Sequence, residues 1–464
     1  MMQSPANHPR PFTLGAALPG WSDVGNAAEL IARYANARSQ TEALAAPLSD
    51  EDCLAQSMPD ASPVKWHLAH VTWFFETFVL EQFEPEFKPY HPAYRVLFNS
   101  YYNAVGDKHP RAQRGLLTRP SLSEVLAWRR NVDERMTALM HSAALDNARA
   151  AELAMLVELG LNHEQQHQEL ILTDIKHLLS LNPLSPVYRP AWPLAAIAPS
   201  PARWLAQPGG LVTVGRDVNT TGFVFDNETP RHSQWLAPYD LMNRLVTHGE
   251  WLAFVQDGGY CEPRWWLSAG WDWLQSQGIE APLYWRQSQP SGDNAQANWH
   301  SFTLHGLVAI DPHTPIAHIS YFEADAYARW LAASHSPFSG ARLLTEFEWK
   351  SAVAPDAALH AARGNFAESR AFHPMPLSRA GDGLLQALGD VWEWTSSSYQ
   401  GYPGYQPWAG AVGEYNGKFM VNQYVLRGGS CATPASHIRE TYRNFFPTNT
   451  RCQFSGLRLA RDGG

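Results

Sequence analysis

The sequence predicts an α+β protein, in which a four-helix bundle is followed by a domain of short strands and frequent turns. The first observation is length, because 464 residues amount to roughly two to three domains of ~150 residues. The second is that apolar residues follow helical spacing up to about residue 181. The third is a run of six prolines between residues 183 and 201, after which Gly and Pro separate short β-like segments.

Four amphipathic segments predict the helices of the first part. They cover residues 26–46, 63–83, 121–140 and 150–181, and the third begins with Ser121-Leu122-Ser123-Glu124, the pattern of a capping box. The long link at residues 84–120 is expected to be functional, because long loops in compact domains usually are. We therefore expect a bundle at residues 1–185, a proline-rich linker at 186–201 and a second domain at 202–464.

The second part is rich in tryptophan and has few helix signals. Two helices are expected, at residues 247–257 and 321–334, and most of the 19 tryptophans fall in this part. A domain with little regular structure depends on buried aromatic rings and tight turns. The tryptophans are therefore expected to mark the scaffold.

The charge and apolar pattern exclude several classes of partner. Subtracting 44 Asp and Glu from 35 Lys and Arg gives −9 without long runs of one sign, which argues against nucleic acid or an anionic membrane. No stretch reaches the ~18 to 20 apolar residues of a membrane span, and residues 1–19 lack the apolar core of a signal peptide. The four cysteines form no CxxC motif. These features predict a soluble, cytoplasmic protein that binds small molecules, and they leave its oligomeric state open.

The strongest chemical signal is a pair of histidines, His163 and His167, four residues apart in an expected helix. This spacing places both imidazoles on one helix face, so both can reach one metal ion. The second helix offers His67 and His70 as a third ligand, and three histidines leave positions open for substrate or oxygen. The spacing does not fix the metal, because imidazole suits zinc, iron, copper and nickel.

Other interpretations of these residues stay open at this point. An i, i+4 histidine pair often lies on the surface without a specific role, or forms a hydrogen-bonded pair in the core. His163-Glu164-x-x-His167 also matches the HExxH pattern of zinc proteases, in which Glu164 would be the general base. A non-catalytic binding module built on a zinc-stabilised bundle is a further alternative.

The long link carries side chains suited to substrate chemistry. Tyr101 and Tyr102 place two phenols where the link is expected to cross the mouth of the bundle, and a phenol can donate a proton or a hydrogen bond. Arg111 and Arg114, three residues apart, can form a fork for a substrate carboxylate. Taken alone, the two pairs are also explained by ordinary packing and a solvated surface.

Six motifs occur in order along the second part. They are Pro208-Gly209-Gly210, Asp257-Gly258-Gly259-Tyr260, and the stretches at residues 319–324, 342–349, 389–394 and 426–430. Together they resemble the sulfatase-modifying-factor fold, a variant of the C-type lectin fold that includes the formylglycine-generating enzyme. That enzyme uses a closely spaced cysteine pair, whereas Cys431 and Cys452 lie twenty-one residues apart, so its activity is not expected.

The first part resembles the DinB-like metal-binding four-helix bundle through residues 63–76 and 163–169. Joined to the second fold, and with residues 439–461, it resembles the ergothioneine-biosynthetic sulfoxide synthases (EgtB-type) over nearly the whole chain. The resemblance implies Fe(II) held by His70, His163 and His167, with His67 not a ligand. It implies no organic cofactor.

The resemblance also implies which residues bind the substrate hercynine. Gln166 and Asn444 match positions that hold its trimethylammonium group. Because a quaternary ammonium needs oxygen dipoles and aromatic faces, Phe445 and Trp392 are further candidates.

The link residues acquire roles through the same resemblance. Tyr101 and Tyr102 match adjacent tyrosines of the cysteine-using branch, in which a phenol near the iron assists oxygen activation. Arg111 and Arg114 are the candidates for binding a carboxylate.

The implied reaction joins the sulfur of cysteine to imidazole C2 of hercynine, with O2 and Fe(II), and oxidises the sulfur to the sulfoxide. Phe446 stands where the γ-glutamylcysteine-using branch has an acid, which argues against that donor. Cys452 stands where many members have a tryptophan, and the smaller side chain opens space near the substrate-binding C-terminal region. The alternative function is therefore a selenoneine synthase, which joins hercynine to a selenosugar.

Overall fold

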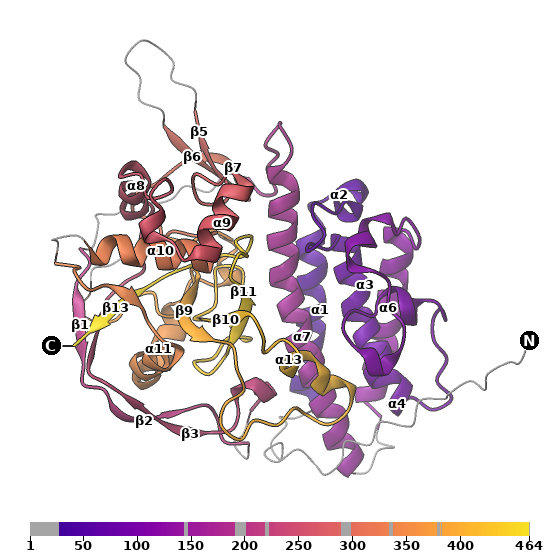
Figure 1. Ribbon diagram of the computed structural model, residues 1–464. Helices are drawn as coiled ribbons and strands as arrows, with labels where there is room; N and C mark the ends of the chain where they lie inside the picture. Colours follow the sequence, from indigo (N-terminus) through magenta and orange to yellow (C-terminus); the bar gives the residue numbers. More distant parts are fainter. Residues whose placement is uncertain are drawn as a thin grey trace, which may run out of the picture. The chain divides into compact units, whose positions relative to one another are not determined.

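The computed structural model describes residues 27–142, 147–190, 201–218, 222–288, 298–333, 337–377, 381 and 383–463 (Figure 1). They fall into two compact units. The first takes its described residues from Met1–His167, Asp217–Thr229 and Gly404–Lys418, and the second from Gln168–Arg216, Pro230–Pro403 and Phe419–Gly464. Helices come first and strands follow, which confirms the predicted α+β class. Most of the predicted linker, residues 191–200, lies outside the described residues, and the domain boundaries stay a prediction.

Helices form the body of the first unit. They are α1 (Ala27–Ala45), α2 (Asp50–Leu54), α3 (Val64–Phe75), α4 (Glu81–Phe83), α5 (Tyr94–Leu97), α6 (Leu122–Met140), α7 (Asn147–Ser180) up to His167, and α13 (Glu414–Gly417). Ser121 caps α6 through reciprocal bonds with Glu124, as the sequence predicts. α3 is buried along its whole length, although it carries the polar residues Lys65, His67, His70 and Thr72. A π-helical turn at Glu76–Leu80 joins it to α4, so the predicted helix at residues 63–83 is observed in three pieces.

Two short segments from later in the chain complete the first unit. One holds the 3-10 helix Asp226–Glu228, and the other holds the 3-10 helix Ala411–Gly413 and α13. The Asp226 carboxylate joins them, because it accepts hydrogen bonds from Asn416 Nδ2 at 2.5 Å and Tyr405 Oη at 3.2 Å. Both segments lie within residues 202–464, where the second domain is expected, and nothing local in them signals their place in the first unit.

Short strands in four sheets form the second unit. They are β1 (Trp204–Gln207), β2 (Gly210–Val214), β3 (His232–Leu236), β4 (Tyr239–Met242), β5 (Trp285–Gln287), β6 (Trp299–Thr303), β7 (Gly306–Ala309), β8 (Arg342–Leu343), β9 (Trp392–Ser398), β10 (Gln423–Arg427), β11 (Asn444–Pro447), β12 (Ser455–Gly456) and β13 (Leu459–Asp462). The sheet orders are β1-β4-β13-β8, β11-β10-β9-β12, β2-β3 and β5-β6-β7. All described pairs are antiparallel except β12 with β9. The last strand, β13, pairs with both β4 and β8 and so ties the chain end into the sheet.

The second unit has more helix than the sequence predicts. Its α-helices are α8 (His248–Gln256), α9 (Ser268–Gln277), α10 (Tyr321–Ala332), α11 (Glu346–Val353) and α12 (Ala357–Arg363), besides the end of α7. The predictions at residues 247–257 and 321–334 correspond to α8 and α10, whereas α9, α11 and α12 are not among the expected helices. α11 and α12 have only eight and seven residues, too few turns for a clear apolar periodicity. Trp251, Trp349, Trp392 and Trp394 are among the largest fully buried side chains, in keeping with a scaffold role. In the described ranges, no helix is both long enough and apolar enough to cross a membrane.

Candidate metal centre and cavity

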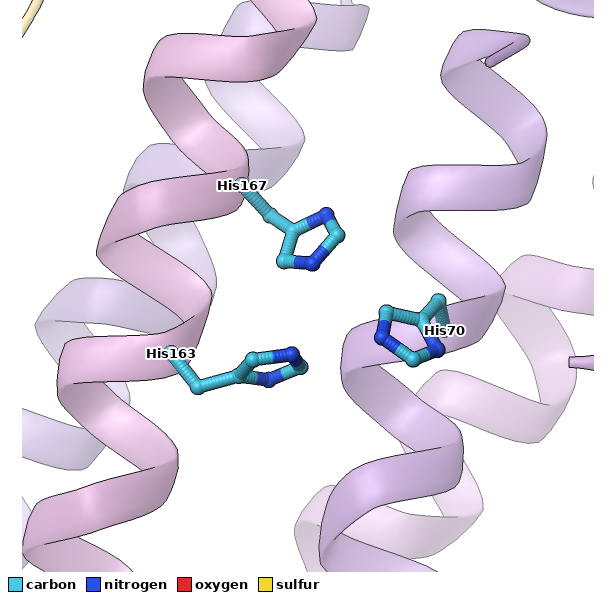
Figure 2. A group of neighbouring side chains, drawn as sticks. All are labelled: His70, His163 and His167. Atoms are coloured by element: carbon cyan, nitrogen blue, oxygen red, sulfur yellow. The ribbon is translucent and has the colours of Figure 1, made fainter. Parts of the chain in front are cut away.

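Three histidines of the first unit point toward one another (Figure 2). His163 and His167 lie on successive turns of α7, and His70 faces them from α3. One ring nitrogen of each lies within 4.8 Å of those of the other two. The structure therefore brings together the three residues that the family resemblance implies as ligands.

All three imidazoles are buried and are held in their neutral form. Burial lowers the pKa of His163 to about 4 and holds the pKa values of His70 and His167 well below the ordinary histidine value. Neighbouring imidazoles lower the pKa of each further, because charges of like sign would repel. A neutral imidazole offers the lone pair that a metal ion needs.

The hydrogen bonds of the rings fit a metal at this place. His70 Nδ1 lies 2.6 Å from the carbonyl oxygen of Phe98, which only accepts, so Nδ1 carries the proton and Nε2 keeps its lone pair. His67 Nδ1 lies 2.8 Å from His167 Nδ1, and a bond donated by His167 leaves its Nε2 free to coordinate. Nδ1 of His163 is buried and has no hydrogen-bond partner among the described residues.

Aromatic rings fix the orientation of the imidazoles. His70 is stacked between Trp66 and Trp73, with ring centroids 4.5 and 5.4 Å away and interplanar angles of 14°. His163 stacks on Phe74 at 4.7 Å. Trp66, Trp73 and Phe74 lie on α3 with His70. This helix therefore orients two of the three imidazoles, those of His70 and His163.

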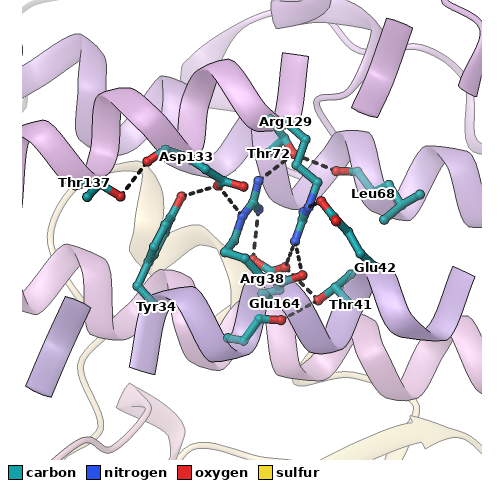
Figure 3. Close-up of polar contacts among 11 residues, drawn as sticks. Tyr34, Arg38, Thr41, Glu42, Leu68, Thr72, Arg129, Asp133, Thr137 and Glu164 are labelled. Carbon is teal, nitrogen blue, oxygen red and sulfur yellow. Dashed lines mark hydrogen bonds and ion pairs between the residues drawn. The ribbon is translucent and has the colours of Figure 1, made fainter. Parts of the chain in front are cut away.

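Glu164 does not face the histidines as a general base would, because it is bound inside the helical core (Figure 3). Its carboxylate accepts hydrogen bonds from Arg38 at 3.0 Å, Arg129 at 2.5 Å and Thr41 at 2.7 Å, and its side chain is fully buried. Burial alone would raise the pKa of Glu164, but Arg129 and Arg38 outweigh it and lower the pKa to about 2. The HExxH interpretation is therefore wrong: the Glu164 side chain is a structural anion.

A cavity adjoins His163 within the first unit. Its walls combine aromatic rings, aliphatic side chains and two amide groups. They are Phe74, Tyr102, Leu159, His163, Gln166, Phe225, Trp408, Val412, Tyr415 and Asn416. Aromatic faces together with amide oxygens form an environment that suits a quaternary ammonium cation.

Two of the predicted site residues, Tyr102 and Gln166, line this cavity. Tyr102 is buried, packs against Trp73 and Phe78 at 5.7 and 5.1 Å, and has a pKa that burial raises well above the ordinary tyrosine value. Its phenol therefore keeps its proton at physiological pH.

The other residues of the long link have protein partners. The Tyr101 hydroxyl accepts a hydrogen bond from Arg111 Nη1 at 2.7 Å, and Arg111 is exposed on the 3-10 helix Arg111–Leu116. Arg114 on the same helix is buried, where it donates to Ser62 and Ser100 and stacks 3.4 Å from the centre of the Trp66 ring. The two guanidinium groups thus bind different partners.

The remaining predicted site residues belong to the second unit. Trp392 is buried and donates its indole N–H to Glu169 at 2.8 Å. On β11, Phe445 stacks on Tyr399 at 4.0 Å and Asn444 Oδ1 accepts the backbone N–H of Phe445. Phe446 and Cys452 are half-buried, and Cys452 forms no disulfide.

Five cavity residues that come from later in the chain were not predicted from the sequence: Phe225, Trp408, Val412, Tyr415 and Asn416. They lie on the two late segments of the first unit, more than fifty residues after His163. The pattern Glu414-Tyr415-Asn416-Gly417-Lys418 has no feature that marks a binding site, so only the three-dimensional structure reveals them.

Two family models match successive parts of the chain. Residues 33–171 match the DinB superfamily, and residues 197–463 match the sulfatase-modifying factor enzyme 1-like domain. The class defined is thus a DinB-type bundle with a buried cluster of three histidines, followed by a domain like that of the formylglycine-generating enzyme. In agreement, the formylglycine-generating enzyme of Streptomyces coelicolor is 28% identical and covers 51% of this chain and 83% of its own.

Relatives that match over nearly the whole chain identify one family within this class. The hercynine oxygenase of Mycolicibacterium thermoresistibile is 33% identical over 95% of this chain and 96% of its own length. That of Mycobacterium tuberculosis is 32% identical over 94% of this chain and 99% of its own. The chain belongs to the hercynine oxygenase family.

Proposed function

We propose that this protein is an oxygenase of hercynine that joins the sulfur of cysteine to imidazole C2 and oxidises the sulfur to the sulfoxide. The observation that carries the proposal is the group of three buried histidines, one of which lines a cavity suited to a quaternary ammonium cation. Family membership over nearly the whole chain supports the reaction class.

We assign Fe(II) to His70, His163 and His167. Three neutral nitrogen ligands and open positions fit non-haem Fe(II), which when bound supplies the activation of O2. The described partners of the His70 and His167 Nδ1 atoms support coordination through Nε2.

Hercynine would place its trimethylammonium group in the cavity beside Gln166. Gln166, Asn416, Trp408 and Phe225 line this space, and a cation without N–H groups is stabilised by amide dipoles and aromatic rings. The contributions of Asn444, Phe445 and Trp392 remain part of the proposal through the family resemblance.

Between the two adjacent tyrosines, we assign the proton-donating phenol to Tyr102. Its side chain lines the cavity with His163 and holds its proton, whereas the Tyr101 hydroxyl already accepts from Arg111. Tyr102 Oη is therefore the atom that can hydrogen-bond the reacting oxygen or protonate it.

The donor is proposed to be cysteine. Arg111 is exposed and can bind its carboxylate, whereas Arg114 is already packed between Trp66, Ser62 and Ser100. Phe446 and Cys452 enter the proposal as residues of the donor pocket. We also propose a cytoplasmic location, since none of the four cysteines forms a disulfide, and a reducing compartment keeps thiols in this state.

Anaerobic reconstitution with Fe(II), followed by O2, hercynine and either cysteine or a selenosugar, tests the function by the product masses. A hercynylcysteine sulfoxide mass supports the proposal, and a selenium adduct alone would replace it with the selenoneine reaction. If neither donor gives a C2-substituted hercynine, the proposed function is wrong. His167→Ala should abolish turnover, while His141→Ala, an exposed histidine of the same unit, should not.

A further inference from the structure

We propose that Glu414 is a positioning residue that holds the Tyr101–Tyr102 segment at the wall of the cavity. The inference rests on the proposed function, in which Tyr102 supplies the phenol. It adds a residue more than 300 positions away in sequence, on α13, that acts through the backbone of the link.

The Glu414 carboxylate accepts hydrogen bonds from two consecutive backbone amides. Glu414 Oε2 accepts the N–H of Asn103 and Oε1 accepts the N–H of Ala104, both at 2.9 Å. These amides open the 3-10 helix Asn103–Val105, whose preceding residue, Tyr102, makes no side-chain cap. The carboxylate thus satisfies donors that the helix cannot satisfy internally.

The buried side-chain amide of Asn99 also binds this segment through hydrogen bonds. Asn99 is fully buried, and its Nδ2 donates to the Tyr102 carbonyl at 3.0 Å while its Oδ1 accepts the Tyr102 N–H at 3.3 Å. Asn99 therefore fixes the backbone of Tyr102, and Glu414 fixes the two peptide groups that follow. With both in place, the Tyr102 side chain has a defined direction.

Some side chains of α13 and of the residue after it bind the link, and others line the cavity. Glu414 and Lys418 bind the link, since Lys418 Nζ donates to the Tyr101 carbonyl and lies 5.5 Å from the centre of its ring. Tyr415 and Asn416 line the cavity. The position of the phenol relative to the cavity is therefore set by one short element that contacts both.

Glu414→Ala and Glu414→Gln test this role in the full-length Fe(II) enzyme. Hydrogen exchange of a peptide covering residues 99–109 should rise at least ~10-fold for Asn103 and Ala104 in Glu414→Ala. The kcat should fall ~10-fold or more, because small displacements of a reacting group are costly, with KM for hercynine within ~2-fold. Glu414→Gln keeps one acceptor oxygen and should give intermediate values of both exchange and kcat.

A matched control comes from Glu368, which accepts the backbone N–H of Ala435 with both oxygens at 3.1 and 3.0 Å in the second unit. Glu368→Ala should raise exchange at Ala435 and leave kcat within ~2-fold.

The outcomes separate the possible failures. Unchanged hydrogen exchange at residues 99–109, or a kcat equal to that of wild type, overturns the positioning role. A fall in kcat together with a rise in KM also overturns it, because that result indicates collapse of the cavity wall. If wild type forms no product, the proposed function fails, and the exchange data alone decide whether Glu414 anchors the segment.

Discussion

The clearest contrast between single residues is that between His67 and His70, three positions apart on α3. His70 contributes a nitrogen to the cluster, whereas His67 contacts His167 Nδ1 at 2.8 Å. A hydrogen-bond partner of a ligand orients it without coordinating. We therefore expect His67→Ala to weaken Fe(II) binding ~10- to 100-fold, whereas His70→Ala removes a proposed ligand and should reduce binding far more.

Anaerobic competition of each variant with a chelator measures these affinities, and the exposed His141→Ala serves as reference. Equal losses for His67→Ala and His70→Ala would place His67 among the ligands.

The two tyrosines of the link are also expected to differ. Tyr102→Phe keeps the packing against Trp73 and Phe78 but removes the hydroxyl at the cavity, so kcat should fall at least ~10²-fold with little change in KM for hercynine. Tyr101→Phe loses a bond to exposed Arg111 and should lower kcat less than ~10-fold. Steady-state product formation at several hercynine concentrations measures both, and the reverse order would transfer the role to Tyr101.

For single site residues, the sequence could predict only what the local geometry of a helix determines. The i, i+4 spacing of His163 and His167 is sufficient to place two imidazoles on one helix face. The choice between His67 and His70 depends on how α3 is rotated against α7, and residue spacing does not contain that rotation. Tyr415 and Asn416 could not be predicted at all, because they reach the cavity only through long-range folding.

Between elements, the first unit is joined by a buried ionic network that links α1, α6 and α7. Arg38 on α1 and Arg129 on α6 both bind Glu164 on α7, and Arg129 also binds Glu42 (Figure 3). Removing the charge of a buried partner leaves the others uncompensated. Glu164→Gln should therefore lower the free energy of unfolding by ~3 to 5 kcal/mol.

Glu42→Gln is the matched control, because it also removes a carboxylate from Arg129 but its side chain is 45% exposed. It should cost less than ~1 kcal/mol. Denaturant unfolding of the metal-free variants, followed by circular dichroism, compares the two. Similar losses from both would show that the buried network contributes no more than a surface pair.

Element by element, prediction succeeded where the periodicity was long. The four long helices of the bundle give three or more turns of apolar repeat, and all four are observed close to their expected bounds. The π-helical turn at Glu76–Leu80 has no sequence signature, since it changes the hydrogen-bond partner and not the apolar spacing. The strands of the second unit are two to seven residues long, too short for alternation to specify their pairing.

At the scale of the whole molecule, the chain does not divide at one point. The first unit combines the bundle with segments from residues 217–229 and 404–418, and these segments carry five of the cavity residues. The three proposed metal ligands thus all come from the bundle, whereas the cavity wall combines bundle residues with residues of the later segments. A variation in the later segments can change the cavity without altering the metal ligands, which is a route by which members of such a family could differ in substrate.

The stability of the whole chain should depend on pH through Lys176 in the second unit. Lys176 is buried, its Nζ lies 2.7 Å from His318 Nε2, and the rings of Tyr284 and Phe454 lie 4.9 and 4.8 Å away. Burial lowers the pKa of Lys176 from 10.5 to about 7. Between these values the unfolded chain holds a proton that the folded chain lacks, so the free energy of unfolding rises with pH across this window.

Lys176→Met removes the titrating group and should reduce this slope by up to ~1.4 kcal/mol per pH unit, while raising stability at pH 7. The buried Cys431 thiol, whose pKa burial raises well above its ordinary value, acts in the opposite direction above pH 9. The difference between wild type and Lys176→Met therefore isolates the lysine, because Cys431 contributes to both. Denaturant midpoints at pH 7, 8 and 9 measure it, with Lys88→Met, an exposed site, as control. Parallel slopes for wild type and Lys176→Met would mean that the buried amine is charged in the folded protein, stabilised by its neighbours in place of water.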